Sequence, residues 1–323
     1  MEEKQHLHMA DAHDPSDETE EQFGVEVLSR PGFIPKSPEF DALFKTEGDC
    51  PNVTVEEIIG LPEKAIGFVF HNVMTKEEMQ AVMSFCEKRT EMIPASTRQD
   101  VRNCDRVEIV SEQFPKFLWD RLKSSNHPLF TAEINDAPTR FFDQPNSLDL
   151  EGTWQPYGLN RLIRVIRYPF EGHFSPHYDG HYCFSQNDRT LLTCMMYFTD
   201  KFDEGETEFL SASFEAGKSK LSTSVTIKIK PRAGSCIVFS HHLLHQGAFP
   251  KQRKSGESEV KWILRTEVCF QRTQAPEQPE DVRRALALLE KARVAENNGD
   301  FDAAQQHYRT AFRLYPELNS IIK

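Results

Sequence analysis

The sequence predicts an α+β fold: a double-stranded β-helix (jelly-roll) core with flanking helices, followed by a C-terminal helical hairpin. Three observations predict it. Between Gly158 and Phe270 lies a series of short segments rich in β-branched and aromatic residues, separated by turn signals such as DEGE and PRAG. Helical periodicity precedes this series, and it returns after the series ends. Strands without intervening helical patterns favour an antiparallel sandwich or barrel over a parallel sheet.

We predict three segments along the chain: an acidic disordered leader at 1–52, a main domain at 53–272, and a linker with a helical hairpin at 273–323. Residues 1–50 contain 13 acidic and 4 basic side chains, a net charge of −9, and show no periodicity. Because the net charge of the whole chain is −12, the rest carries only −3. The main domain therefore offers no sign of the basic face that nucleic-acid binding requires.

The sequence carries no sign of a membrane span or a secretory signal. It has no run of about 18 apolar residues, and its start, MEEKQHLHMADAHDP, lacks the basic and apolar regions of a signal peptide. The seven cysteines are scattered without a C-x-x-C pair, which argues against a disulfide framework. We therefore expect no membrane association and a cytoplasmic or nuclear location.

The main domain is expected to begin with a strand in EKAIGFVFHNV and a helix in TKEEMQAVMSFCEKR. Thr75 is the expected N-cap of this helix, and Glu78 is its capping-box partner. The apolar face of the helix consists of Met79, Val82, Met83 and Cys86. A second helix is expected in SEQFPKFLWDRLKSS. The strands expected after it are RLIRVIRYPF, TLLTCMMYFT, SVTIKIKP, SCIVFS and VKWILRTEVCF.

The C-terminal segment has helical periodicity in DVRRALALLEKARVAENNGDFDAAQQHYRTAFRLYPEL. Its second half resembles a tetratricopeptide repeat at Ala304, Tyr308, Ala311 and Pro316, with Gly299 at the turn, whereas its first half lacks the expected aromatic pattern. Two interpretations stay open: a hairpin that only caps the main domain, and a docking site for a partner protein.

The stretch HFSPHYDG contains His177 and Asp179 in an H-x-D spacing, which places both side chains on one face of a strand. An apolar strand further along ends in SHHLLHQG, with His241, His242 and His245 as candidates for a third ligand. Two histidines and one carboxylate with open coordination positions form the facial triad of non-haem Fe(II) oxygenases. The H-x-D pair alone is a weak signal, because many histidines in an acidic chain have a nearby carboxylate by chance.

From about Gly67 to Phe270 the chain resembles the prolyl 4-hydroxylase-like branch of the Fe(II)/2-oxoglutarate-dependent oxygenases. The superfamily motif H-x-D…H followed by a basic residue reads here as His177, Asp179, His245 and Lys261. The other matching segments are RYPFEGHFSPHYD, TLLTCMMYFTD, EGETEF and PRAGSCIVFSHHLLHQG. Two features depart from the family: Glu204 replaces a glycine in EGETEF, and the polar loop FPKQRKSGESEV lengthens the spacing before the basic residue. Such a loop costs little closure entropy.

The resemblance implies that His177, Asp179 and His245 hold Fe(II), that 2-oxoglutarate and dioxygen are cosubstrates, and that ascorbate supports activity. The far carboxylate of 2-oxoglutarate needs a buried cation, because an unpaired buried charge is costly. Lys261 is our first choice for this cation.

Arg265 is the competing cation, since it is four residues further on and shares the strand face of the lysine. It binds either carboxylate of 2-oxoglutarate in one interpretation, and in another it merely pairs with Glu267 at the rim. Tyr168 and Tyr197 can donate hydroxyl hydrogen bonds to the cosubstrate. Thr193 shares a strand face with Tyr197 and is expected to line the pocket.

The function that the resemblance implies is a 2-oxoglutarate-dependent dioxygenase, which releases succinate and CO2 and hydroxylates a prolyl residue of a protein or peptide. One alternative is an oxygenase acting on another side chain or on a small molecule. A second is a catalytically inactive jelly-roll scaffold that binds partner proteins, although an intact ligand set argues against it.

Several residues outside the motif are candidates for substrate contact. We expect His241 and His242 to be exposed at a strand end and His173 to lie in a turn. The candidates for substrate-side positions are Arg102, Asn103, Arg106, Trp154, Tyr157, His181 and Tyr182.

Overall fold

The structure is a computed structural model that describes residues 31–44, 52–62, 65–89, 92–135, 152–185, 187–214, 221–275, 279–297, 300–316 and 318. The chain divides into two compact units. The first comprises residues 1–132, 156–184 and 188–271, and the second comprises residues 133–155, 185–187 and 272–323.

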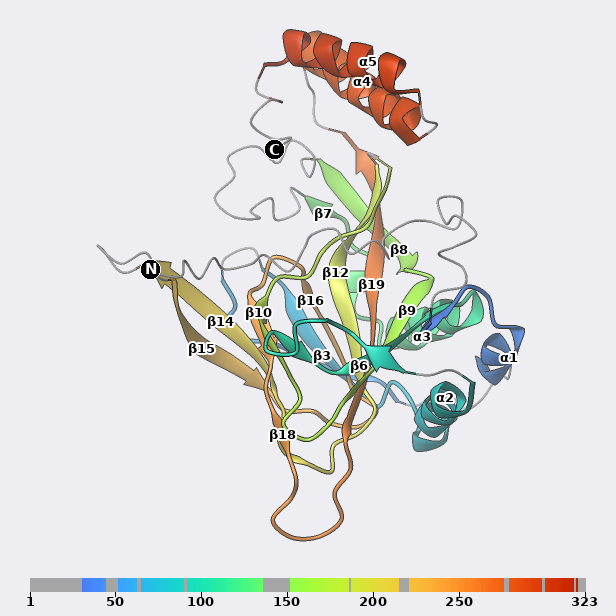
Figure 1. Cartoon of the computed structure of the whole chain (residues 1–323), viewed down its shortest axis with the longest axis vertical. Coiled ribbons are helices and arrows are strands. Elements are labelled where there is room, and N and C mark those ends of the chain that lie inside the picture. The colour runs from blue at the N-terminus through green and yellow to red at the C-terminus, as the bar shows by residue number, and fades with distance from the viewer. Residues whose placement is uncertain are drawn as a thin grey trace. The chain divides into compact units, whose positions relative to one another are not determined.

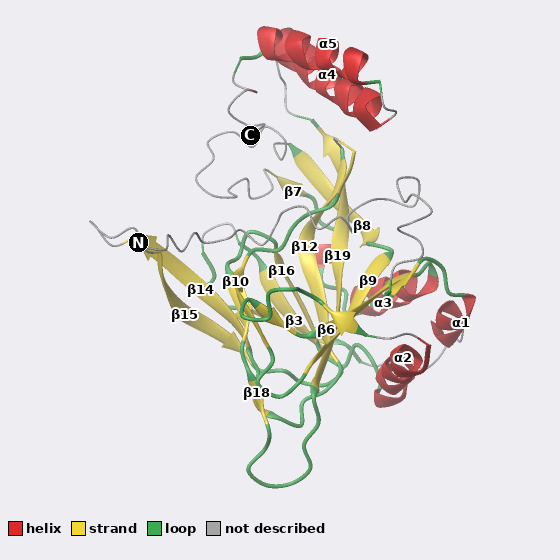
Figure 2. Ribbon diagram, in the orientation of Figure 1, coloured by secondary structure: helices red, strands yellow, loops and turns green. Residues whose placement is uncertain are grey.

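Two main sheets are built from the described residues (Figures 1 and 2). The strands of the larger sheet are β1 (Phe33–Ile34), β2 (Thr54–Glu57), β3 (Gly67–His71), β6 (Asp105–Val110), β9 (Leu162–Tyr168), β12 (Asp188–Tyr197), β16 (Cys236–Ser240) and β19 (Lys261–Gln274), with β4 (Ile93–Pro94), β7 (Ile134–Asn135), β8 (Thr153–Leu159) and β11 (Cys183–Ser185) at its margins. Those of the smaller sheet are β5 (Arg102–Asn103), β10 (His173–His177), β14 (Thr207–Phe214), β15 (Leu221–Ile229) and β17 (His245–Gly247). A separate short pair joins β13 (Asp203–Glu204) and β18 (Pro250–Lys251).

The order of the strands confirms the predicted jelly-roll core. The larger sheet follows the path β1-β6-β9-β19-β12-β16-β3-β2, and the smaller sheet follows β15-β14-β17-β10-β5. Along the chain, β9 is followed by β10 in the other sheet, β12 by β14, and β16 by β17 before β19 returns. The central strands of the larger sheet are buried on both faces, which explains why they read as almost continuous apolar runs.

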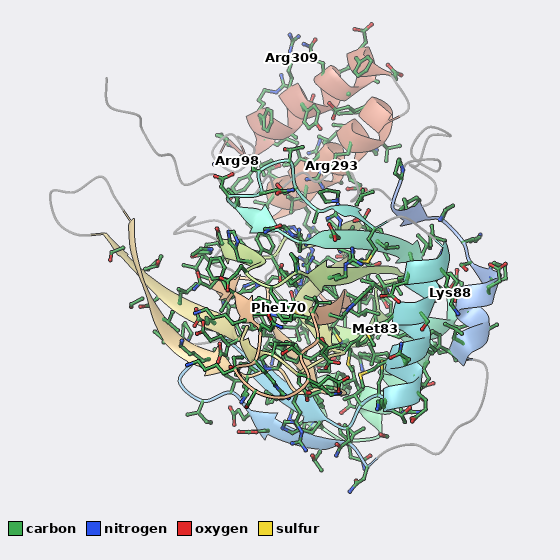
Figure 3. The ribbon with its side chains drawn as sticks, turned by 60° about the horizontal axis from the view of Figure 1, so that its bottom comes forward. Met83, Lys88, Arg98, Phe170, Arg293 and Arg309 are labelled. Atoms are coloured by element: carbon green, nitrogen blue, oxygen red, sulfur yellow. The ribbon has the colours of Figure 1, made fainter. Side chains whose placement is uncertain are left out.

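Helices α1 (Pro38–Asp41), α2 (Lys76–Arg89) and α3 (Gln113–Lys123) lie together on one side of the sheets (Figure 1). The predicted capping box of α2 is confirmed: the Thr75 hydroxyl accepts from the Glu78 amide at 3.2 Å, and the Glu78 carboxylate accepts from the Thr75 amide at 2.8 Å. Val82 and Cys86 on the predicted apolar face are fully buried, whereas Lys88 on the same helix is exposed (Figure 3).

The prediction of a disordered leader is wrong for residues 31–44. This part contains β1 and α1, and Phe40 is completely buried, with its ring centroid 5.4 Å from that of Phe44 and 6.0 Å from that of Phe114. The acidic composition of the leader hid this short apolar anchor, SPEFDALF, whose aromatic residues gain more from burial than the segment loses by ordering. Residues 1–30 and 45–51 lie outside the described residues.

In the second unit, the predicted C-terminal hairpin is present as two helices that pack against each other, α4 (Glu280–Asn297) and α5 (Phe301–Leu314). The cluster between them consists of Ala285, Leu286, Ala311 and Leu318. Ala304 is also buried. The turn residue Gly299 lies outside the described residues. Among the described helices, none is long and apolar enough to cross a membrane.

Candidate metal and cosubstrate site

Three side chains with metal-ligand chemistry meet where β10 ends and β17 begins. His177 is the last residue of β10, and it stands directly opposite His245, the first residue of β17. Asp179 follows β10 by two residues. One ligand atom from each of the three residues lies within 4.8 Å of the other two. The sequence-predicted trio is therefore brought together, although its members come from segments more than sixty residues apart.

Both imidazoles are held in the tautomer that a metal requires. Nδ1 of His177 lies 2.8 Å from the Ser175 carbonyl, and Nδ1 of His245 lies 2.9 Å from the Leu243 carbonyl. Because a carbonyl oxygen can only accept, each Nδ1 carries the proton and each Nε2 keeps its lone pair. Burial lowers the pKa of both histidines, which favours the neutral ligand form. This arrangement fits a divalent cation at the two Nε2 atoms.

The carboxylate of Asp179 completes the set. Its two oxygens lie 3.8 Å from Nε2 of His177 and 3.6 Å from Nε2 of His245. Burial would raise the pKa of this carboxyl group, but the adjacent Arg265 guanidinium and the two imidazoles hold it well below its usual range. The Thr193 hydroxyl donates to it at 2.6 Å. Asp179 is therefore a buried, ionised and oriented ligand, as an Fe(II) site needs.

Lys261 is buried in the interior beside Tyr168. It is only 2% exposed and stands opposite Tyr168 in the register of β19 and β9, with Nζ 5.1 Å from the centre of the Tyr168 ring. Nζ donates to the Gly205 carbonyl at 2.9 Å, and no carboxylate of the described residues pairs with it. Burial lowers its pKa from 10.5 to about 8. The charge of Glu206 acts on Lys261, but no salt bridge joins the two side chains. A buried ammonium without a direct ion pair suits an anion such as one end of 2-oxoglutarate. The longer preceding loop has not turned Lys261 out of the interior.

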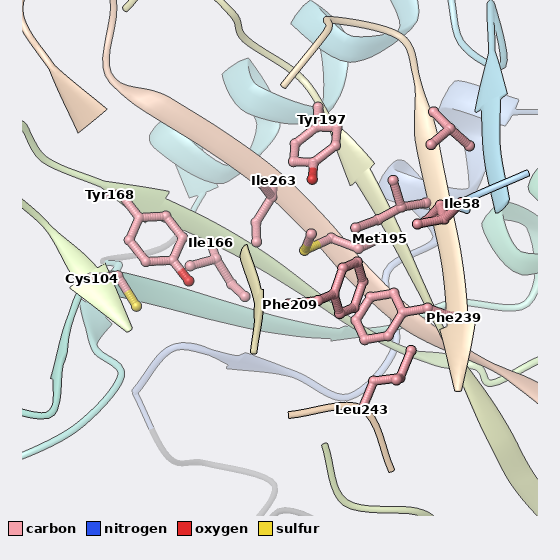
Figure 4. Packing of buried hydrophobic residues seen from close by; sticks show 12 residues of the cluster. Ile58, Cys104, Ile166, Tyr168, Met195, Tyr197, Phe209, Phe239, Leu243 and Ile263 are labelled. Carbon is pink, nitrogen blue, oxygen red and sulfur yellow. The ribbon is translucent and has the colours of Figure 1, made fainter. Parts of the chain in front are cut away.

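Two tyrosines line the same interior (Figure 4). Tyr197 is completely buried, and its hydroxyl lies 2.7 Å from the Thr207 hydroxyl. Tyr168 is 4% exposed and belongs to the same core cluster. Burial raises the pKa of both tyrosines far above the ordinary value, so both remain protonated donors at neutral pH.

Arg265 is partly buried and belongs to a series of alternating charges. Its Nη2 lies 3.0 Å from Asp179 Oδ1 and 3.4 Å from Glu267 Oε1. Glu267 also pairs with Arg164 at 3.0 Å, and Arg164 lies 3.4 Å from Glu108. Opposite charges this close compensate for one another's loss of hydration. Arg265 thus pairs with Glu267, as one of the sequence-based alternatives predicts, but Glu267 is fully buried and not at a rim.

Other candidate residues lie elsewhere than predicted. His241 is 2% exposed and not at an exposed strand end, and His173 opens β10 and not a turn. Trp154, a candidate for a substrate-side position, is completely buried, with the Arg272 guanidinium 4.5 Å from its ring centre. Arg106 pairs with Glu108.

The remaining candidates are divided between interior and surface. Tyr182 is buried with its hydroxyl at Arg164, whereas His181 is exposed and Tyr157 is half-exposed. Arg102 lies with its guanidinium 4.4 Å from the centre of the Phe174 ring, and that ring stacks on His177 at 3.5 Å. Arg102 is thus linked to His177 through Phe174, and Tyr182 is linked to Asp179 through Arg164, Glu267 and Arg265.

Two buried charged residues of the site, Arg164 and Glu108, were missed from the sequence. The signal was present for Arg164, because it is four residues before Tyr168 on one strand and shares its face by the two-residue period. No comparable signal pointed to Glu108, since its burial depends on pairing of β6 with β9.

Comparison with known proteins gives a family match and several structural similarities. Residues 163–265 match the sequence model of the 2OG-Fe(II) oxygenase superfamily. No curated protein matches the chain. The solved structures that resemble it include a viral collagen prolyl hydroxylase of Paramecium bursaria Chlorella virus-1, with a TM-score of 0.36, 18% identity and coverage of 69% of this chain and 99% of that one. Another is a prolyl-4-hydroxylase of Pseudomonas putida, with a TM-score of 0.37, 14% identity and coverage of 69% and 93%.

The matched residues contain the centre of the site. They begin in β9, end at Arg265 in β19, and include the whole His-Asp-His trio. The metal and cosubstrate of this superfamily are Fe(II) and 2-oxoglutarate, with dioxygen as the second cosubstrate. The chain therefore contains a domain of the 2OG-Fe(II) oxygenase superfamily.

Proposed function

We propose that the protein is a 2-oxoglutarate-dependent dioxygenase in which His177, Asp179 and His245 hold Fe(II). The observation that carries this proposal is the pair of imidazoles with protonated Nδ1 atoms and converging Nε2 atoms, beside an ionised carboxylate. When bound, Fe(II) with 2-oxoglutarate and dioxygen supplies an oxidant that hydroxylates a C–H bond, with release of succinate and CO2.

The residues of the chain bind and orient the cosubstrate. Lys261 pairs with the far carboxylate of 2-oxoglutarate, and Tyr168 and Tyr197 line that end of the pocket as protonated donors. Thr193 and Arg265 hold the Asp179 carboxylate in place. Phe174 and Phe239 cover the two imidazoles at ring distances of 3.5 and 4.9 Å, which excludes water from this side of the metal.

The substrate proposed is a prolyl residue of a protein or peptide, supported by the branch-specific order of the motifs around Tyr168, Tyr197 and the ligand trio. The competing substrate is a charged metabolite, which would need charges of its own in the pocket. The buried charges Arg265, Glu267 and Arg164 pair with one another. Because these charges already have partners within the protein, they do not call for a charged group on the substrate. This favours a neutral substrate group. Ascorbate as a supporting reductant, a cytoplasmic or nuclear location and partner docking at α4 and α5 stay predictions.

The test of the function is succinate formation by the purified protein with Fe(II), ascorbate and 2-oxoglutarate, compared with the same mixture containing a metal chelator. Chelator-sensitive succinate release supports the dioxygenase. If the protein binds neither Fe(II) nor 2-oxoglutarate, the proposal fails and the scaffold alternative takes its place.

Replacement of Arg265 by Met is expected to weaken Fe(II) binding by about 10- to 100-fold, because outer residues that orient a metal ligand typically contribute this much. The KM for 2-oxoglutarate should change less, since the guanidinium contacts Asp179 and not the deep pocket. Fe(II) titration and cosubstrate kinetics measure the two effects. A large rise in the cosubstrate KM with unchanged Fe(II) affinity would instead assign Arg265 to the cosubstrate.

The affinity for 2-oxoglutarate is expected to fall as the pH rises above about 8. Burial lowers the pKa of Lys261 to about 8, so below this pH the ammonium is present to pair with the carboxylate. Above this pH the lysine is neutral, and binding of the anion must also drive its protonation, which weakens the affinity. The dissociation constant should rise by up to about tenfold per pH unit in this range. In Lys261→Arg the guanidinium stays charged, so its dissociation constant for 2-oxoglutarate should not rise in this pH range. An equal dependence of the dissociation constant on pH in the wild type and in Lys261→Arg would contradict the prediction.

A further inference from the structure

Helix α5 has a polar face on the side away from α4. Its buried residues Ala304 and Ala311 share the side of the helix that packs against α4. A groove runs along the other side, and the described residues that line it are Asp302, Gln305, Gln306, Arg309, Thr310 and Arg313. In an array of repeats, the next hairpin would cover this side of the helix by apolar packing. Because the lining is polar and charged, the groove suits a polar ligand better than a stacked hairpin.

Two arginines in this groove carry charges that the described residues do not neutralise. Arg309 and Arg313 are both exposed, and neither guanidinium has an ion pair or a hydrogen bond within the described part of the chain. Arg309 projects outward from the hairpin (Figure 3). The two residues are four apart on α5, where like charges have Cβ atoms about 5–6 Å apart and destabilise a helix. A ligand with two carboxylates would remove this repulsion and accept hydrogen bonds from both guanidiniums.

The length of the groove matches a short extended peptide. From Asp302 to Arg313 the helix rises about 16 Å, at about 1.5 Å per residue. An extended peptide covers about 3.3 Å per residue, so about five residues fill the groove. Acidic side chains two apart on such a peptide lie on one side about 7 Å apart, close to the rise of about 6 Å from Arg309 to Arg313. The amides of Gln305 and Gln306 offer donors and acceptors for the peptide backbone.

An acidic peptide fits this surface better than a nucleic acid does. Residues 280–314, which comprise both helices, contain six acidic and six basic side chains and so have no net charge. Nucleic-acid binding needs a basic face that displaces counterions along the phosphate backbone. Asp302 would repel that backbone at one end of the groove, whereas it can accept a hydrogen bond from a peptide N–H.

We infer that the groove on α5 is a docking site for an extended acidic segment of a partner protein. Arg309 and Arg313 bind two acidic side chains in the pattern acid-x-acid, and Asp302, Gln305 and Gln306 bind the peptide backbone. The inference goes beyond the proposed dioxygenase function and does not depend on it, because no residue of the groove belongs to the metal or cosubstrate site.

The first experiment measures the fluorescence anisotropy of a labelled hexapeptide during titration with the full chain at low ionic strength. The probe is Ser-Gly-Glu-Ser-Glu-Ser amide with an uncharged coumarin at its N-terminus. Its binding should weaken with added salt, because the ion pairs are exposed. The same peptide with both glutamates replaced by glutamine should bind at least about tenfold more weakly. Ser-Gly-Ser-Glu-Glu-Ser amide should also bind more weakly, because adjacent side chains of an extended peptide point to opposite sides.

The double substitution Arg309→Gln and Arg313→Gln should raise the dissociation constant of the acidic probe at least about tenfold. The matched control is Arg283→Gln with Arg284→Gln, which removes the same charge from exposed positions of α4 and should change this constant by less than about twofold. Circular dichroism shows whether both proteins fold.

Equal binding of the glutamate and glutamine probes, equal effects of the two double substitutions, or no binding by the folded wild type overturns the inference. So does equal binding of the two glutamate spacings. If a short oligothymidylate binds more tightly than the acidic probe and the substitutions of Arg309 and Arg313 abolish its binding, the groove is a nucleic-acid site instead. Succinate formation without peptide should be unchanged in both double variants, so failure of the docking site and failure of the dioxygenase are separate outcomes.

Discussion

Asp179→Ala is expected to abolish both Fe(II) binding and succinate formation. The substitution removes the only carboxylate of the His-Asp-His trio among the described residues, and it leaves Arg265 beside two imidazoles without their shared anion. Even residues that merely orient a metal ligand contribute about 10- to 100-fold to affinity or activity, so loss of the ligand itself should exceed a hundredfold. His177→Ala and His245→Ala should behave alike, because each removes one Nε2.

Fe(II) titration and succinate release measure this effect, and circular dichroism shows whether each variant folds. Asp203→Ala is the matched control, since Asp203 in β13 is an exposed aspartate and should tolerate the change. A folded Asp179→Ala variant with wild-type succinate formation would remove the trio from the reaction and with it the proposed metal site.

Lys261→Ala is expected to raise the KM for 2-oxoglutarate by at least about a hundredfold. The far carboxylate would then enter a dry pocket with no cation, and removal of one partner of a buried ion pair costs about 3–5 kcal/mol. Fe(II) binding should change little, because the Lys261 ammonium contacts the Gly205 carbonyl and none of the trio. The two substitutions are therefore distinguishable. Replacement of Lys261 raises the KM for 2-oxoglutarate, whereas replacement of Arg265 mainly weakens Fe(II) binding.

Initial rates over a range of 2-oxoglutarate concentrations measure the effect, and Lys230→Ala serves as control, because Lys230 is an exposed residue directly after β15. Lys261→Arg should recover a large part of the affinity because it restores the positive charge. An unchanged KM in Lys261→Ala would assign the far carboxylate to another cation. Arg102 is a candidate, because its guanidinium lies 4.4 Å from the centre of the Phe174 ring that stacks on His177.

Much of the fold could be predicted from local sequence patterns. The capping box at Thr75 and Glu78 is predictable because it involves only two residues that are three apart in the sequence. The central strands of the larger sheet are predictable from their apolar runs. β14 was not predicted as a strand, because its sequence, TEFLSASF, contains small and polar residues and few β-branched ones. Its place in the sheet comes from pairing with β15 and β17, which the sequence of β14 alone does not encode.

By itself, the sequence determined the ligand trio and the candidate cations. The H-x-D spacing marked His177 and Asp179 as ligands, although only His177 lies in β10 and Asp179 follows the strand. The two-residue period of a strand places Lys261 and Arg265 on one face of β19. Only the tertiary structure decided what each group meets there. The pairing of β9 with β19 and β6 brings Arg265, Glu267 and Arg164 together and buries Glu267 and Arg164.

The same holds for the imidazole of His241, which sequence reasoning had assigned to the surface. His241 is buried because it directly follows β16, which pairs with β12 in the interior of the larger sheet. Periodicity along one strand fixes the direction of a side chain, but burial and charge pairing depend on which distant strands become neighbours. The chemistry of the ligands is thus local in the sequence, whereas their electrostatic setting arises from long-range packing.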